Sequence, residues 1–231
     1  MDDVENLLER GWLSRQSADF TSAVLAKAEI RSLADGAPIY HVDDTAPLLC
    51  GIAEGAVILA CPHPIYGLLD VHLKIASEWF GIFGLQHNAG RLFSAVARGS
   101  TRIVVLRRTA YLELRGRNSE FEEAFNSLHL SECQVILRSA LDLLVQDYRA
   151  RLISRILTLC LVDLEAPGRK PIQLPLTQRE LAEMCNLSRK SVQSYLSDME
   201  KDGLCKVGYR SLEITNPAAL VQLMRTLAET D

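Results

Sequence analysis

Long apolar runs and paired cysteines are both missing from this chain of 231 residues. No window of eighteen apolar residues exists, so the sequence predicts no membrane-spanning helix. The cysteines form no C-x-x-C pair and no close Cys/His quartet, which argues against a structural zinc site or an iron–sulfur cluster. We therefore predict no metal site and interpret the six cysteines as small buried residues in a reducing cytosol. They are Cys50, Cys61, Cys133, Cys160, Cys185 and Cys205.

The usual arrangements of catalytic residues are also missing. The sequence shows no Ser/His/Asp order and no glycine-rich phosphate loop of the Walker or dinucleotide-binding type. Cys61 and His63 are the one pair that a catalyst would use, but residues two apart on a strand share a face, so their proximity carries no information. We predict that the protein is not an enzyme.

A basic excess is missing as well, because 25 Lys and Arg stand against 29 Asp and Glu. From Ala166 onward the balance is nine to eight, which permits nucleic-acid binding without arguing for it. The composition, 48% hydrophobic and 23% charged, is that of an ordinary globular protein long enough for two domains. The acidic start, Met1-Asp2-Asp3-Val4-Glu5, is unlike a signal peptide, so we expect a soluble, cytoplasmic protein.

The N-terminal half shows two successive patterns of apolar residues. Apolar residues in the first thirty positions have helix-like spacing, which predicts one or two short helices packed on the residues after them. Residues 30–112 alternate short apolar runs with turn residues, which predicts an antiparallel β sandwich or barrel. The runs include Leu48–Ile52, Ala56–Cys61 and Arg102–Leu106, and the turn residues include Asp43-Asp44 and Asn88-Ala89-Gly90.

A helical pattern occupies Ser119–Leu164. Two series of apolar residues, each spaced by seven, form a seam that favours a long helix pairing with its twin over a helix lying on its own domain. The series are Leu130, Leu137 and Leu144, then Leu141 and Tyr148; Gln134 and Arg151 also fall on the seam. The segment Ala166–Pro171 then breaks the helix and marks a linker.

Residues Leu176–Leu204 have the pattern of a helix-turn-helix. Thr177 and Glu180 form a capping box that starts the first helix. Asn186 stands at the turn, where a left-handed residue is needed, Ser188 can cap the second helix, and Gly203 ends it. The positions that two crossing helices would bury are Leu181, Cys185, Leu187, Val192 and Tyr195, with small Ala182 at the closest approach.

The exposed N-terminal half of the second helix carries polar residues, including Gln193, and a recognition helix presents this half to base edges. A short hairpin comes next, with strands Leu204–Val207 and Ser211–Ile214 joined through Gly208-Tyr209-Arg210, as in the wing of a winged helix. We expect Arg189 to grip a guanine, and Lys206 and Arg210 to contact phosphates. The predicted DNA-binding residues are Thr177, Gln178, Ser188, Arg189, Lys190, Ser191, Ser194, Lys206 and Arg210.

The order of these parts resembles the cyclic-AMP receptor and fumarate–nitrate regulator (Crp/Fnr) family of transcription factors over nearly the whole chain. Two motifs carry the resemblance. One is Leu174–Ala182 with Leu187–Val192; the other is Gly81-Ile82-Phe83-Gly84-Leu85 with Ser94-Ala95-Val96-Ala97, which looks like the family's phosphate-binding cassette. The resemblance implies an α+β fold: an N-terminal cyclic-nucleotide-binding-like β-roll (jelly roll) over 1–117, a long dimerisation helix over 118–165 and a winged helix-turn-helix over 166–231.

The cassette departs from the family at the residues that bind cyclic AMP. Ile82 stands in place of the glutamate for the ribose hydroxyl and Phe93 in place of the phosphate-binding arginine, with Arg91 two residues away. Ile136 and Leu137 stand where receptor-type members hold the adenine. We expect an unidentified effector rather than cyclic AMP bound in the usual manner. Candidate ligand-binding residues are Gly81, Ile82, Gly84, Leu85, Arg91, Phe93, Ser94, Ala95, Ile136 and Leu137.

The family's oxygen-sensing branch uses an N-terminal cysteine cluster, and the absence of any cysteine before Cys50 excludes it. A haem-dependent regulator stays open, with an axial ligand among His41, His63, His72, His87 and His129. An effector-independent regulator, and a ligand-binding module with a partner other than DNA, stay open too.

The recognition helix also departs from the family's Arg-Glu-x-x-x-Arg pattern, because Lys190 replaces the glutamate and Ser194 the second arginine. We therefore expect an unusual half-site. The resemblance implies a homodimer on double-stranded DNA, with half-sites of a pseudo-palindromic operator about 34 Å apart. It also implies RNA polymerase as a partner and no membrane.

Overall fold

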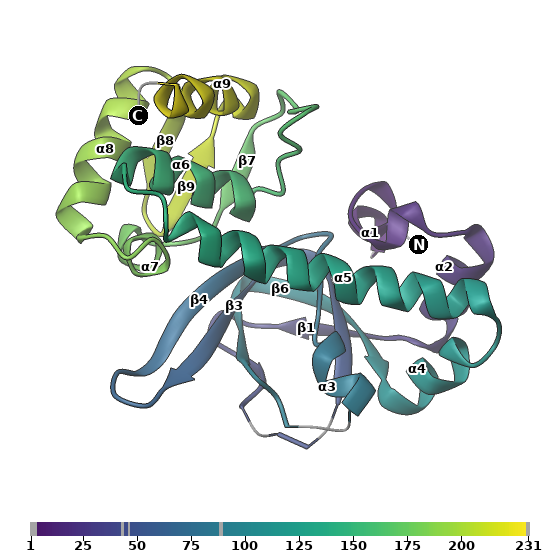
Figure 1. Cartoon of the computed structure of the whole chain (residues 1–231). Coiled ribbons are helices and arrows are strands. Elements are labelled where there is room, and N and C mark those ends of the chain that lie inside the picture. Colours follow the sequence, from purple (N-terminus) through teal and green to yellow (C-terminus); the bar gives the residue numbers. More distant parts are fainter. Residues whose placement is uncertain (1–3, 43, 46, 88–89, 230–231) are drawn as a thin grey trace. The chain divides into compact units, whose positions relative to one another are not determined.

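The computed structural model describes residues 4–42, 44–45, 47–87 and 90–229 (Figure 1). The predicted turn residues Asp43 and Asn88-Ala89 lie outside them. Internal contacts separate two compact units, Met1–Leu69 with Leu73–Gln134, and Asp70–His72 with Val135–Asp231. The predicted three-part division at residues 117 and 165 stays a prediction.

Short helices open the first unit, as the sequence predicts. They are α1 (Glu5–Glu9), the 3-10 helix η2 (Leu13–Arg15) and α2 (Ala18–Lys27). The Ser17 hydroxyl caps α2 by accepting from the Phe20 N–H at 3.2 Å. The apolar side chains of these helices join the core of the unit: Leu7, Leu13, Phe20 and Val24 are fully buried.

A six-stranded sheet forms the body of the first unit. Its order is β1-β6-β3-β4, with β2 on β6 and β5 on β3, and β6 runs antiparallel to β1, β2 and β3. This arrangement confirms the predicted antiparallel β-roll. The strands are β1 (Glu29–Leu33), β2 (Pro38–Tyr40), β3 (Leu48–His63), β4 (Gly67–Ile75), β5 (Trp79–Phe80) and β6 (Ser94–Arg107), with helix α3 (Ile82–His87) between the last two.

Strand β3 is one strand of 16 residues, although the sequence predicts two separate runs. Its register with β6 shifts on either side of Glu54, and Gly55 has a φ of +80°. A bulge therefore bends the strand without ending it. Glycine is needed there, because a Cβ on Gly55 would lie 2.5 Å from the Ser100 carbonyl oxygen.

The predicted long helix over Ser119–Leu164 is wrong, because the stretch forms two helices. After α4 (Arg108–Arg115), α5 covers Ser119–Asp142 and α6 covers Tyr148–Leu159. The Asp147 carboxylate caps α6 by accepting from the backbone N–H groups of Arg149 (2.6 Å) and Ala150 (3.2 Å). The seam is therefore cut short: Leu144 lies in the turn, Tyr148 and Arg151 lie in α6, and Leu130, Gln134, Leu137 and Leu141 remain on α5.

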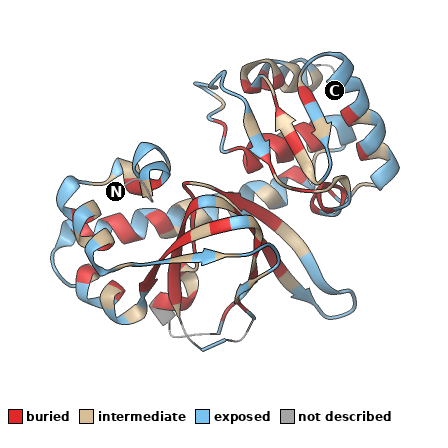
Figure 2. Ribbon diagram, turned by 180° about the vertical axis from the view of Figure 1, so that it is seen from behind, coloured by how far each residue is buried: buried red, intermediate tan, exposed pale blue. Residues whose placement is uncertain are grey.

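The second unit contains the rest of the fold, and α6 packs on α9 within it. Its three-stranded sheet has the order β7-β9-β8, with antiparallel neighbours. Figure 2 shows buried residues on α6 and exposed ones along the outer sides of α8 and α9. The elements are β7 (Ile172–Leu174), α7 (Gln178–Met184), α8 (Arg189–Lys201), β8 (Cys205–Gly208), β9 (Ser211–Ile214) and α9 (Pro217–Ala228). Among the described helices, none is long and apolar enough to cross a membrane.

Candidate nucleic-acid interface

The capping box that starts α7 is present as predicted. The Thr177 hydroxyl accepts from the Glu180 N–H at 3.1 Å, and the Glu180 carboxylate accepts from the Thr177 N–H at 2.6 Å. Because both bonds satisfy N–H groups at the helix start, they fix where α7 begins. Gln178 and Arg179 therefore form its first turn.

The turn between α7 and α8 also follows the prediction. Asn186 has a φ of +50°, in the left-handed region that asparagine tolerates. The Ser188 hydroxyl accepts from the Ser191 N–H at 3.0 Å and caps α8, and Gly203, with a φ of +72°, follows its C-terminus. These local signals set the crossing of the two helices.

An apolar contact holds α7 and α8 together. Leu181, Cys185 and Val192 are buried as predicted, whereas Leu187 and Tyr195 are only half-buried. Burial raises the pKa of the Cys185 thiol to about 12, so this cysteine packs as a neutral group. The contact leaves the polar side of α8 at the surface.

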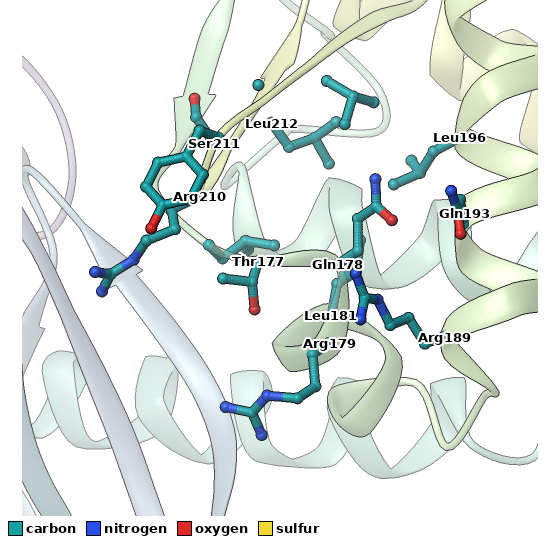
Figure 3. Close-up of a pocket in the computed structure, with 14 residues that line it drawn as sticks. Thr177, Gln178, Arg179, Leu181, Arg189, Gln193, Leu196, Arg210, Ser211 and Leu212 are labelled. Atoms are coloured by element: carbon teal, nitrogen blue, oxygen red, sulfur yellow. The ribbon is translucent and has the colours of Figure 1, made fainter.

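A groove of about 450 Å³ lies between α8, the first turn of α7 and the β8–β9 hairpin (Figure 3). Four predicted DNA-binding residues line it: Thr177, Gln178, Arg189 and Arg210. The predicted residues Ser188, Lys190, Ser191 and Ser194 lie on the N-terminal half of α8 and its cap, outside the lining of this groove.

The hairpin has the form of a wing, with β8 and β9 joined by a tight turn at Tyr209-Arg210. Arg210 lies at the tip, with a φ of +51°. Lys206, which is predicted to contact phosphates, lies in β8 rather than at the tip, and it pairs across the strands with Glu213 at 3.1 Å. This ion pair offsets part of its charge.

Arg179 and Tyr209 also line the groove, and the sequence reasoning missed both. Arg179 lies in the first turn of α7 and pairs with Glu183 at 2.5 Å. Tyr209 has 93% of its surface exposed. A large exposed aromatic residue at a hairpin tip could have been found from its place between Gly208 and Arg210.

Comparison with known proteins shows what this geometry is similar to. A family model described as the Crp-like helix-turn-helix domain matches residues 150–223. The transcriptional regulator LdrP of Thermus thermophilus is 25% identical over 182 residues, which are 79% of this chain and 90% of that protein. Residues 150–223 thus match the Crp-like helix-turn-helix domain, and the chain is similar to a transcriptional regulator over most of its length.

Solved structures are similar to this chain in fold. FixK2 of Bradyrhizobium japonicum matches with a TM-score of 0.70 and 19% identity, over 85% of this chain and 96% of that chain. A CRP-family transcriptional regulator of Thermus thermophilus matches with a TM-score of 0.62 and 22% identity, over 84% and 96%. These likenesses confirm the predicted α+β fold, with a β-roll and a C-terminal winged helix.

The segment that resembles the family's phosphate-binding cassette faces the core of the first unit. Ile82 and Leu85, both on α3, are fully buried in the apolar cluster of the first unit. Gly81 has a φ of +98°, and a Cβ there would lie 2.4 Å from the Leu48 carbonyl oxygen. The Ile82 side chain, which replaces the family's glutamate, is therefore a core residue.

Arg91 also takes part in the structure of the roll. It is 4% exposed, and its Nη1 donates to the carbonyl oxygens of Leu48 (3.0 Å) and Gly81 (3.3 Å). The nearby Ser94 hydroxyl accepts from the Val42 N–H at 3.0 Å. These contacts tie the start of α3 to β3 and engage the Arg91 guanidinium.

The remaining ligand candidates are Gly84 on α3, Phe93 directly before β6, Ala95 in β6, and Ile136 and Leu137 on α5. Ala95 is buried and Phe93 half-buried, while Ile136 and Leu137 are about half exposed. Among the haem candidates, the His63 ring nitrogen Nδ1 accepts from the Ile65 and Tyr66 N–H groups, and the side chain of His87 lies outside the described residues. In the described part of the chain, no cluster of three His, Cys, Asp or Glu residues could hold a metal ion.

Proposed function

We propose that this regulator binds a pseudo-palindromic operator as a homodimer, with α8 of each copy in a major groove. The observation that carries the proposal is the groove between α8 and the wing, with Arg189 and Gln178 on one side and Arg210 on the other (Figure 3). A guanidinium can bond the O6 and N7 atoms of guanine together, while residues at the wing and at the α7 start suit phosphates.

The dimer proposal rests on an exposed apolar face of α5. Leu130, Leu137 and Leu141 have 52–60% of their surface exposed, although they follow one another at four- to seven-residue spacing along the helix. Such a seam is self-complementary, so a second copy of α5 would cover it in a two-fold arrangement. Two recognition helices so related would meet half-sites about 34 Å apart.

For the effector, we propose a small molecule other than cyclic AMP bound in the family's usual manner. Ile82 offers no hydrogen bond to a ribose hydroxyl, and the Arg91 guanidinium bonds the backbone of the roll. Adding cyclic AMP should therefore leave the melting temperature of the full chain unchanged. A rise of several degrees with increasing cyclic AMP would contradict this part of the proposal.

The DNA-binding proposal is tested on the full chain by fluorescence anisotropy with an operator selected from random duplexes. We expect affinity to fall steeply with salt, and Arg189→Ala to weaken operator binding by roughly 5- to 150-fold. Lys201→Ala is the matched control, because Lys201 is a cation at the other end of α8 that pairs with Asp198 at 2.8 Å. Weak, salt-insensitive binding would instead favour a partner other than DNA. RNA polymerase as a partner stays a prediction.

A further inference from the structure

We infer that Gln193 is a second base-reading residue, which recognises an adenine one or two base pairs from the guanine contacted by Arg189. The inference rests on the proposed function, because it assumes that α8 enters a major groove. It predicts that this chain prefers a different base sequence from that read by a recognition helix with two arginines and a glutamate.

Gln193 lies one helical turn after Arg189 on α8, so the two side chains share one side of the helix. Both are exposed and both line the groove beside the wing, as Figure 3 shows. Four residues of helix rise about 6 Å, and stacked base pairs are about 3.4 Å apart. A helix aligned with the groove therefore places the two side chains over base pairs that are one or two steps apart.

The two side chains are also available to an outside ligand. Among the described residues, neither Arg189 nor Gln193 forms a hydrogen bond or an ion pair through its side chain with another part of the chain. Gln173 differs, because its amide contacts Glu213 at 2.5 Å and Ser211 at 3.2 Å within the winged-helix unit. Exposed Arg179 and Lys201 likewise have carboxylate partners within their own helices.

The chemistry of an amide selects the base. A glutamine offers one donor and one acceptor side by side, which match the N7 acceptor and the N6 amino group of adenine. The amide is uncharged, so its contact with a phosphate would not release a counterion from the DNA. An exposed neutral amide beside a base-reading arginine is therefore suited to read sequence.

The test is selection of binding sites from a random duplex library with the full chain and its variants. The wild type should enrich half-sites in which a guanine and an adenine lie one or two base pairs apart. Gln193→Ala should lose the adenine preference alone, keep the guanine and weaken binding to the wild-type site by roughly 5- to 150-fold. The slope of affinity against salt should stay unchanged, because no charge is removed.

Two further variants sharpen the result. Gln193→Glu should move the preference at that position toward cytosine, whose amino group a carboxylate accepts. Ser197→Ala, exposed one turn further along α8, should leave the site unchanged. An unaltered site for both Gln193 variants would overturn the inference while leaving the proposed function standing. If the wild type enriches no site at all, the proposed function fails and the inference with it.

Discussion

The guanidinium carbon of Arg91 lies 4.1 Å from the centre of the Tyr40 ring, within the range of a cation–π contact. The same guanidinium donates to the carbonyl oxygens of Leu48 and Gly81. Arg91 thus braces three segments of the β-roll.

Arg91→Ala should destabilise the β-roll by about 1.5–3 kcal/mol, because hydrogen bonds from a buried charged group are lost. Urea unfolding of the full chain measures this change. Arg117→Ala is the matched control, since Arg117 lies over the Phe121 ring at 5.1 Å but has about half of its side chain exposed. Equal, small effects of the two substitutions would show that Arg91 has no bracing role.

Lys74→Met should destabilise the first unit by about 3–5 kcal/mol. The Lys74 ammonium is buried between Glu132 on α5, at 2.8 Å, and Glu78, at 3.2 Å. Burial disfavours the charge of Lys74, but the two carboxylates hold its pKa above the ordinary value, and removing it leaves them without their cation. Lys27→Met, which breaks the exposed pair with Glu113, should cost below about 1 kcal/mol. Similar losses in calorimetry would contradict the prediction.

Asp147→Ala should destabilise the start of α6 by about 1 kcal/mol, whereas Asp147→Asn should keep most of the cap. Hydrogen bonding to Arg149 lowers the pKa of the Asp147 carboxyl to about 2 from an ordinary value of 3.8. A lowered pKa means that the charge stabilises the fold above about pH 4 and that this contribution disappears as the pH falls toward 2. Denaturant unfolding across this range should show the wild type and Asp147→Asn converging. A constant difference between them would rule out the ionised cap.

Leu137→Glu should convert the proposed homodimer to monomers in analytical ultracentrifugation, because a charge would replace an apolar residue at the centre of the α5 seam. Operator affinity should fall with it, since one copy reaches a single half-site. Ile30→Glu is the control, because Ile30 on β1 is exposed to a similar degree, 50% against 60%, but lies outside α5. A monomeric wild type, or a Leu137→Glu variant that is still a dimer, would contradict dimerisation through the α5 seam.

Local signals made the winged helix predictable. The capping box at Thr177, the left-handed Asn186 and the Ser188 cap each satisfy backbone groups within a few residues, so the sequence alone reveals them. The break after Asp142 was missed because no glycine or proline marks it. Its signal was the capping residue Asp147, which sits in a stretch whose seven-residue spacing favoured a continuous helix.

Contacts between distant segments were harder to predict. The role of Arg91 depends on Leu48 and Tyr40, which lie more than forty residues earlier in the chain and meet it only in the folded sheet. The bulge at Gly55 and the contribution of Arg179 to the groove likewise depend on neighbours from other elements. The spacing of residues along one helix or strand does not reveal such contacts between distant segments.

Hydroxyl-radical footprinting of the full chain on its selected operator tests the central claim most directly. We expect two protected segments related by two-fold symmetry, with centres about 34 Å or one helical turn apart. Arg189→Ala should reduce the protection of both segments to the same extent. A single protected segment, or protection that does not change when the operator is scrambled, would contradict a homodimer that reads DNA with α8.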